Sequence, residues 1–302
     1  MPSMQIARLR AIVDKKFVPV VFMSYMLTTN SAYALDVDPG DYTALDPGTN
    51  LGLLYLQHAE RNSVYSGGTN VTSKSGLDSD IGILRGVTYQ QWGDTLINLQ
   101  LLLPFGQLKG QGNASSLGSN SGVGDPILAN AIFFHKDPVK NRYFAITQYL
   151  YVPVGQYDHN ESLNLGENRW KYVFQGGYIH GITDRWTLDL TGDVTLFGKN
   201  DDYTDASLTL KQDPQFQAQT YLRYKATDKL QVYAGLSRLW GGETELDGVK
   251  QNDQPNQKKF MVGGSYFITP KTQLMLTYGE DFSIDDGFKE GARLNFRLLQ
   301  VF

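Results

Sequence analysis

The sequence of 302 residues contains no cysteine, which excludes a disulfide-stapled fold and any zinc or iron–sulfur site built on thiolates. It also lacks a run of 18 or more apolar residues, so a bundle of membrane-spanning helices is not expected. Charged residues make up only 19% of the chain and the net charge is −4, which argues against a nucleic-acid partner. The sequence therefore predicts neither a cofactor nor a metal site.

What the chain has in quantity is glycine, with 31 residues, and aromatic side chains, at 12% of the sequence. A hydrophobic content of 41% is too high for a disordered protein. Many tyrosines and glycines with few charges are unusual for an α/β enzyme and ordinary for an all-β protein.

The N-terminus predicts the cellular compartment. A basic stretch over residues 8–16 precedes an apolar run over residues 17–27, and small residues follow at 31–34. This order is typical of a secretory signal peptide, here residues 1–34 with cleavage after Ala34. The apolar run is too short for a membrane anchor. A secreted all-β chain without cysteine indicates the envelope of a Gram-negative bacterium.

Several segments alternate apolar and polar side chains, the period of a β-strand with two different faces. The clearest is 186–197, where Leu188 and Leu190 alternate with Asp189 and Thr191. The pattern is unclear near 51–62, 78–91 and 142–155, where no face is assigned. In all, the sequence predicts about twelve strands, near residues 51–62, 78–91, 95–105, 124–136, 142–155, 168–182, 185–198, 214–226, 229–241, 257–268, 272–283 and 288–302.

The connections between these strands are alternately long and short, apart from a brief last link. This order predicts a transmembrane antiparallel up-and-down β-barrel with short periplasmic turns and longer extracellular loops. Residues 51–302 would form the barrel and residues 35–50 a short periplasmic N-terminal segment. Whether that segment plugs the barrel is left open.

Aromatic residues fall where a membrane barrel would need them. Trp92 and Trp186 lie at short-turn ends of predicted strands, and Trp170 and Trp240 at long-loop ends. This distribution is expected if the four tryptophans belong to two aromatic girdles, one at each membrane interface. The chain ends on Phe302, at the end of an alternating strand, and we expect it to serve as an assembly signal.

The polar faces of the predicted strands indicate the lining of the barrel. Charged side chains such as Arg293 and Arg297 would cost ~2–4 kcal/mol each near the membrane midplane, so they must point inward. The same reasoning predicts thirteen lumen-lining residues: Asn98, Gln100, Lys171, Gln175, Asp189, Asp193, Gln217, Gln219, Arg223, Gln231, Arg293, Asn295 and Arg297. Asp189 and Asp193 are expected to lie between Lys171 and Arg223, and an ion pair with Arg223 could pack the lumen shut.

Short motifs resemble one family over nearly all of the predicted mature chain. They are Asp-Val-Asp-Pro-Gly-Asp-Tyr at 36–42, Gly-Asp-Pro at 124–126, Leu-Asn-Leu-Gly-Glu-Asn-Arg-Trp at 163–170, Trp-Gly-Gly-Glu at 240–243 with Asp-Gly at 247–248, and Gly-Phe-Lys-Glu at 287–290 leading into Arg-Leu-Asn at 293–295. Together they resemble the family of the meta-pathway of phenol degradation, whose members are transporter-like outer-membrane barrels. The resemblance implies a channel associated with the uptake of hydrophobic or aromatic compounds.

We therefore expect a monomeric outer-membrane channel for passive uptake of small hydrophobic or aromatic molecules. Its expected partners are outer-membrane lipid and lipopolysaccharide, the barrel-assembly machinery and the solute. A rival interpretation is a non-conducting barrel that serves structure or surface interaction through its long loops. A lipid-modifying enzyme is a third, but no Gly-x-Ser-x-Gly motif occurs and the four histidines have no metal-ligand spacing.

Overall fold

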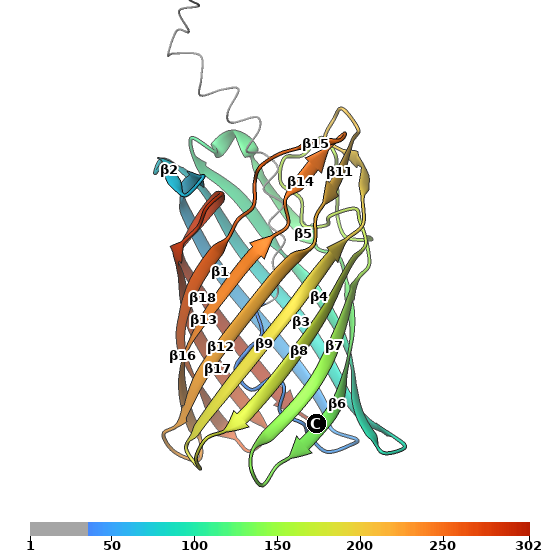
Figure 1. Cartoon of the computed structure of the whole chain (residues 1–302), viewed down its shortest axis with the longest axis vertical. Helices are drawn as coiled ribbons and strands as arrows, with labels where there is room; N and C mark the ends of the chain where they lie inside the picture. Colours follow the sequence, from blue (N-terminus) through green and yellow to red (C-terminus); the bar gives the residue numbers. More distant parts are fainter. Residues whose placement is uncertain (1–35) are drawn as a thin grey trace, which may run out of the picture.

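The computed structural model describes residues 36–302, so the predicted signal peptide lies outside the described residues. Twelve long strands form a tilted antiparallel barrel (Figure 1). They are β1 (Asn50–Ser66), β3 (Ser75–Trp92), β4 (Thr95–Gly112), β6 (Ile127–Asp137), β7 (Arg142–Tyr151), β8 (Lys171–Gly181), β9 (Trp186–Phe197), β12 (Gln215–Lys225), β13 (Leu230–Gly241), β16 (Gln257–Thr269), β17 (Thr272–Ser283) and β18 (Gly287–Val301).

Each long strand pairs with its neighbours in the chain, and the first strand pairs with the last. The β1–β18 ladder runs from Leu51 opposite Val301 to Tyr65 opposite Gly287. This pairing removes both free edges of the sheet, which a barrel in lipid requires because no water is present to satisfy an open edge. The all-β, up-and-down barrel of twelve strands is therefore confirmed.

The two faces of the barrel wall differ as the alternation predicts. In β9, Leu190 is 43% exposed on the outside while Asp189, one residue earlier, is 5% exposed. Leu222 on β12 and Leu236 on β13 are also exposed on the outer surface. An exposed apolar band around a polar interior is the arrangement that a hydrocarbon surrounding stabilises.

The long connections carry structure of their own at one end of the barrel. Two of them combine into a separate sheet of four short strands, β10 (Asn200–Tyr203), β11 (Leu208–Gln212), β14 (Thr244–Leu246) and β15 (Val249–Lys250). Two others hold β2 (Thr69–Thr72), β5 (Ser119–Val123) and the single-turn helix η2 (Ser115–Leu117). Within residues 36–302 no helix is long and apolar enough to cross a membrane.

Strand ends differ from the predicted ones where the barrel wall extends or breaks. The β3–β4 ladder continues to Ser75 opposite Gly112, well beyond the predicted end at residue 105. In contrast, β7 ends at Tyr151 and β8 begins at Lys171, with an irregular segment between them. Pro153 lies in that segment and has no N–H group to donate to a ladder.

The four tryptophans lie at strand ends, two at each end of the barrel. Trp92 ends β3 and Trp186 begins β9 at the short turns, where Trp186 packs on Tyr224 with ring centroids 4.7 Å apart. Trp170 precedes β8 and Trp240 lies near the end of β13, both at the long loops. Their role as interfacial girdles stays a prediction.

The terminal residue lies at the seam where the barrel closes. The Phe302 N–H donates to the Asn50 carbonyl at 3.0 Å. Its ring covers Gly52 of β1, where an added Cβ would lie 3.2 Å from the ring. Phe302 therefore holds the last strand to the first.

Deleting Phe302 is expected to lower the yield of folded barrel several-fold, because the seam loses a hydrogen bond and a ring contact and the expected assembly signal is gone. The measurement is heat-modifiable gel mobility of outer-membrane fractions, with Phe302→Tyr as the matched control that keeps the ring. Equal yields of the deletion and of Phe302→Tyr would refute the prediction.

Candidate functional site

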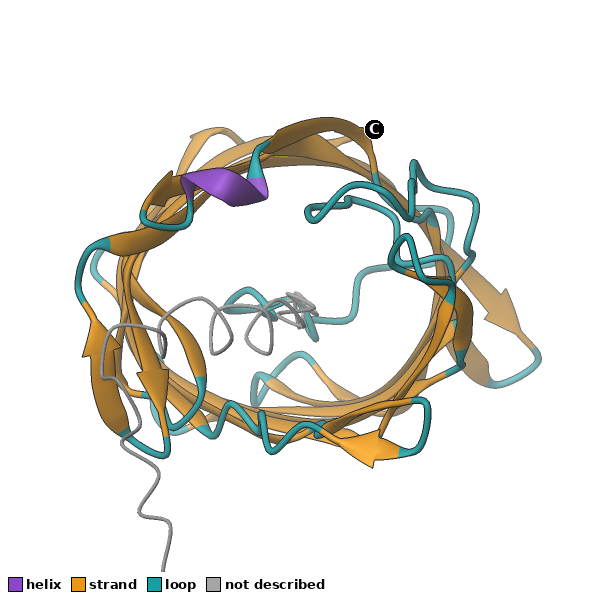
Figure 2. Ribbon diagram, turned by 90° about the horizontal axis from the view of Figure 1, so that it is seen from above, coloured by secondary structure: helices purple, strands orange, loops and turns teal. Residues whose placement is uncertain are grey.

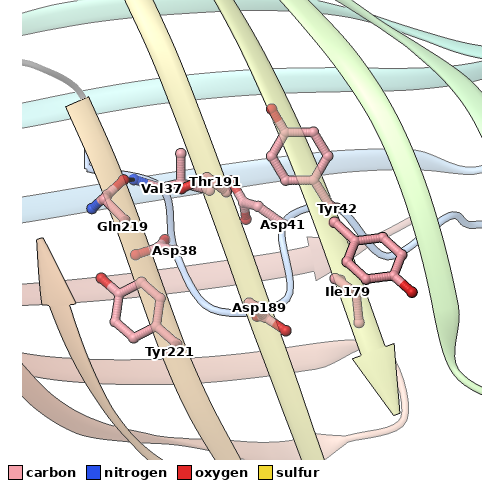
Figure 3. A pocket seen from close by; sticks show the side chains of 10 residues that line it. Val37, Asp38, Asp41, Tyr42, Ile179, Asp189, Thr191, Gln219 and Tyr221 are labelled. Carbon is pink, nitrogen blue, oxygen red and sulfur yellow. Dashed lines mark hydrogen bonds between the residues drawn. The ribbon is translucent and has the colours of Figure 1, made fainter. Parts of the chain in front are cut away.

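Residues 36–49 lie inside the barrel, in the half that holds the short turns, and we call this segment the lumen plug (Figures 1 and 2). The plug reverses direction through a turn in which the Thr43 N–H donates to the Gly40 carbonyl at 2.9 Å. Gly40 has φ +87°, a conformation that a residue with a Cβ rarely adopts. Its N–H donates to Oδ2 of Asp189 on β9 at 2.8 Å. Figure 3 shows Asp189 among the side chains that surround the bend of the plug.

Three aspartates of the plug bind cations on the wall. Asp36 accepts from Arg293 Nη1 at 2.6 Å and lies 3.5 Å from Lys259 Nζ. Asp38 accepts from Arg297 Nη1 at 2.9 Å. Charge-assisted hydrogen bonds at such distances are the strong class, so the plug is held electrostatically.

Asp41 completes this arrangement by joining two cations. One of its carboxylate oxygens accepts from Arg85 Nη1 at 2.8 Å and the other from Arg297 Nη1 at 3.2 Å. The four cations Arg85, Lys259, Arg293 and Arg297 come from β3, β16 and β18, and we call them the basic ladder.

The apolar side chains of the plug pack against wall residues other than the basic ladder. Tyr42 is buried, and its hydroxyl donates to Gln175 Oε1 at 2.8 Å. Its ring occupies the space beside Gly177, where an added Cβ would come within 2.2 Å of ring carbons. Val37 and Tyr42 join a buried cluster with wall residues that include Phe133 and Tyr143. The absence of a side chain at Gly177 thus makes room for the plug.

All thirteen residues predicted to line the lumen lie on the buried side of the wall. Ten are buried, and Asp193, Gln231 and Asn295 are half-buried. Six of them contact the plug: Gln175, Asp189, Gln217, Gln219, Arg293 and Arg297.

An ion pair of Arg223 with Asp189 or with Asp193 was expected, and the pair with Asp189 is present. Arg223 donates to Asp189 Oδ1 at 2.8 Å. Lys171 does not face Asp193: the β8–β9 register places Lys171 opposite Phe197 and Gln175 opposite Asp193. Gln175 accordingly donates to Asp193 at 3.1 Å. The expected position of Lys171 was wrong. Lys171 lies four residues before Gln175, at the end of β8 that adjoins the long loop.

The sequence analysis missed a second buried network above the plug. Glu290 on β18 is fully buried and contacts Arg61 at 3.2 Å, Lys259 at 2.9 Å and Arg293 at 2.7 Å. A register shift between β1 and β18 at Glu60 and Arg61 accompanies this cluster. Such a bulge has no clear local signal, so the inward turn of Glu290 could not be read from alternation.

Above the plug lies a cavity of about 470 Å³, which we call the outer vestibule. Its wall includes Ile81 and Ile83 of β3, Ile127 of β6 and Tyr151 of β7, and loop residues such as Leu163 close it. On β3, Ile83 and the plug-binding Arg85 are successive inward positions. The vestibule therefore ends where the plug begins.

Part of the charge at the outer vestibule is paired, although Glu161 and Asp205 also line the cavity. Glu167 binds Lys171 through one carboxylate oxygen, at 2.5 Å, and Arg169 through the other, at 2.8 Å. Burial alone would raise the pKa of Glu167, but Lys171 and Arg169 lower it to about 2. The Lys171 ammonium also lies 4.1 Å from the centroid of the Tyr151 ring. An entering solute thus meets paired charges beside an apolar and aromatic wall.

Asp125 fixes the irregular segment that closes the vestibule. Its two carboxylate oxygens accept the N–H groups of Gly155, at 2.9 Å, and Glu167, at 2.8 Å. Burial raises the pKa of Asp125, and these two N–H groups act in the opposite direction. The Gly-Asp-Pro motif at 124–126 thus ties both ends of the segment between β7 and β8 to the wall.

Within residues 36–302 no group of three or more His, Asp or Glu side chains is placed to hold a metal ion. The rings of His58 and His159 bond to Asp80 and Asp202, and His180 bonds to a tyrosine.

The fold and sequence were compared with known proteins. A crystallised outer membrane channel from Pseudomonas putida F1 is 39% identical, with a TM-score of 0.86, covering 88% of this chain and 100% of that one. The β domain of the Bordetella autotransporter BrkA is 12% identical, with a TM-score of 0.51, covering 85% and 100% of the two chains, and shares the fold alone. Comparison with curated protein sequences gives no match.

The sequence profile of the family described as "Putative MetA-pathway of phenol degradation" matches residues 60–298. This match covers most of the barrel, and the resemblance inferred from the motifs is confirmed. The chain is an outer-membrane β-barrel and belongs to this family.

Proposed function

We propose that the protein is a channel for passive uptake of small hydrophobic or aromatic molecules, which enter through the outer vestibule and pass when the lumen plug moves aside. The observation that carries this proposal is the apolar vestibule directly above the plugged lumen. The similar barrel of Pseudomonas putida F1 is itself described as an outer membrane channel.

The size and lining of the outer vestibule fit such a solute. A volume of about 470 Å³ lies within the range of ~300–1,000 Å³ that small-molecule pockets have. Apolar area gains ~25 cal/mol per Å² when it leaves water, so Ile83, Ile127 and Leu163 favour an apolar guest. Glu167, Lys171 and Arg169 are already paired, so this cluster offers no free charge to an ionic group of the solute.

The docked plug also supports the rival, a barrel that conducts nothing. Its three aspartates and Tyr42 fill the lower lumen, so a solute in the vestibule has no path while the plug stays in place. The channel and the rival therefore differ in one respect: only the channel requires solute to cross.

The channel is tested by replacing one vestibule residue. Ile83→Asn puts an amide into the apolar wall and should lower the uptake rate of radiolabelled benzyl alcohol by intact cells about tenfold, equivalent to ~1.4 kcal/mol. The matched control is Val139→Asn, in an exposed periplasmic turn. Heat-modifiable mobility verifies that both variants fold. Equal uptake by cells with and without the protein would reject the channel and favour the rival.

A further inference from the structure

The basic ladder depends on the plug for its counter-ions. Within residues 36–302, Arg85 forms an ion pair with Asp41 alone, and Arg297 with Asp38 and Asp41 alone. Both side chains point from the wall into the lumen, where 10% of the Arg85 side chain and 6% of the Arg297 side chain are exposed. If the plug leaves, the two arginines lose every carboxylate that faces them.

A guanidinium group in this position has a definite ligand preference. Its planar set of N–H donors matches the two oxygens of a carboxylate, and pairing is strongest away from bulk water. Here the wall orients both donors: Gln100 accepts from Arg85 at 3.0 Å and Gln273 accepts from Arg297 at 2.6 Å. Nη1 of each arginine donates to the plug, so these two groups would meet a carboxylate that enters the emptied lumen.

An aromatic pocket lies beside these arginines. The Tyr42 ring of the plug sits against Gly177 within a cluster that holds Tyr89, Phe133 and Tyr143. In the chain, Tyr42 follows Asp41, whose carboxylate binds Arg85 and Arg297. The Asp41 carboxyl carbon and the Tyr42 ring are seven bonds apart along the chain, so the two groups together match an aromatic acid that has a flexible chain between its ring and its carboxylate.

We infer that the lumen beneath the plug is a binding site for a small aromatic carboxylate, whose acid group takes the place of Asp41 on Arg85 and Arg297 and whose ring takes the place of Tyr42. This inference rests on the proposed function, because the solute must reach the site through the channel. The plug is then a tethered substitute for the solute. A tethered group acts at an effective concentration in the ~millimolar range, so a free acid competes poorly until docking is weakened.

The decisive variant is Asp38→Asn/Asp41→Asn, which removes the competing carboxylates and keeps every cation of the ladder. 4-Phenylbutyrate, an aromatic acid with such a chain, should bind it at least tenfold more tightly than it binds the wild type, measured by titration calorimetry in detergent. Benzyl alcohol has the ring without the charge and acetate the charge without the ring, so neither should gain as much. Adding Arg297→Gln to the variant should abolish the gain.

The matched control is Asp46→Asn, which removes the same charge from an exposed side chain of the same segment. If 4-phenylbutyrate binds the double variant no more tightly than this control, or if benzyl alcohol gains as much as 4-phenylbutyrate, the inference is overturned. Should the double variant assemble poorly, the single Asp41→Asn variant must show the same direction of change.

The two proposals fail separately. Uptake of benzyl alcohol that depends on Ile83, without any gain in 4-phenylbutyrate binding, would leave the channel standing and remove the carboxylate site. A clear gain in 4-phenylbutyrate binding, with no solute crossing the membrane, would reject the channel and leave a binding site in a closed barrel.

Discussion

A disulfide that joins the plug to the wall is expected to stop uptake of any solute, and a reducing agent should restore it. In Tyr42→Cys/Gly177→Cys the two new side chains replace a ring and the space it fills. The ideal Cβ at residue 177 lies 2.4 Å from Cγ of Tyr42. Adding one C–C bond of about 1.5 Å puts the two Cβ atoms at most about 4 Å apart, within reach of a disulfide.

The natural chain contains no cysteine, so no other thiol competes for the new pair. The measurement is benzyl alcohol uptake by cells before and after treatment with dithiothreitol. The single Gly177→Cys variant is the control with the opposite expectation: its Cβ overlaps the Tyr42 ring, so it should loosen the plug and speed uptake. Unchanged uptake by the oxidised double variant would mean that solute does not pass the plug.

Glu290→Gln should cost the barrel about 3–5 kcal/mol of unfolding free energy, the penalty for removing one partner from a buried ion pair. The Glu290 side chain is 0% exposed and faces three cations, Arg61, Lys259 and Arg293. A neutral amide would leave these cations close together in a dry environment. The measurement is urea unfolding in lipid, followed by gel mobility.

Glu60→Gln is the matched control for this loss. Glu60 lies on the outer face of β1, and its side chain is half exposed next to His58. Exposed pairs of this kind contribute ~0–1 kcal/mol, so the control should unfold almost like the wild type. Similar unfolding free energies for the two variants would show that the Glu290 cluster is not essential to the wall.

How far the sequence predicts the wall depends on what each strand faces. β9 alternates clearly because Asp189 and Asp193 point into a polar part of the lumen while leucines point outward. In β7 the buried positions are Tyr143, Ala145, Thr147, Tyr149 and Tyr151. They face the plug and the vestibule, so both faces of β7 are largely apolar. Alternation cannot show which face of such a strand points inward, so the sequence alone did not assign the faces of β7.

The plug itself could not be derived from local pattern. Asp36, Asp38 and Asp41 were visible as a motif, but their meaning depends on Arg293 and Arg297 at the other end of the chain. Arg85 and Lys259 lie on wall positions that no motif marked. Contacts between residues so far apart in the sequence depend on closure of the barrel. Closure determines which inward side chains lie at the same height in the lumen.

The plug's attachment to the last strand has a consequence for folding kinetics. Asp36 and Arg293 are separated by 257 positions along the chain, and Asp38 and Arg297 by 259. Contacts between segments so far apart carry the largest loop-closure entropy and form late. The plug therefore completes its docking only after β18 has met β1, and until then Arg293 and Arg297 lack their partners on the plug. Docking of the N-terminal segment is thus a kinetic marker of a completed barrel, and its rate should follow the rate of closure.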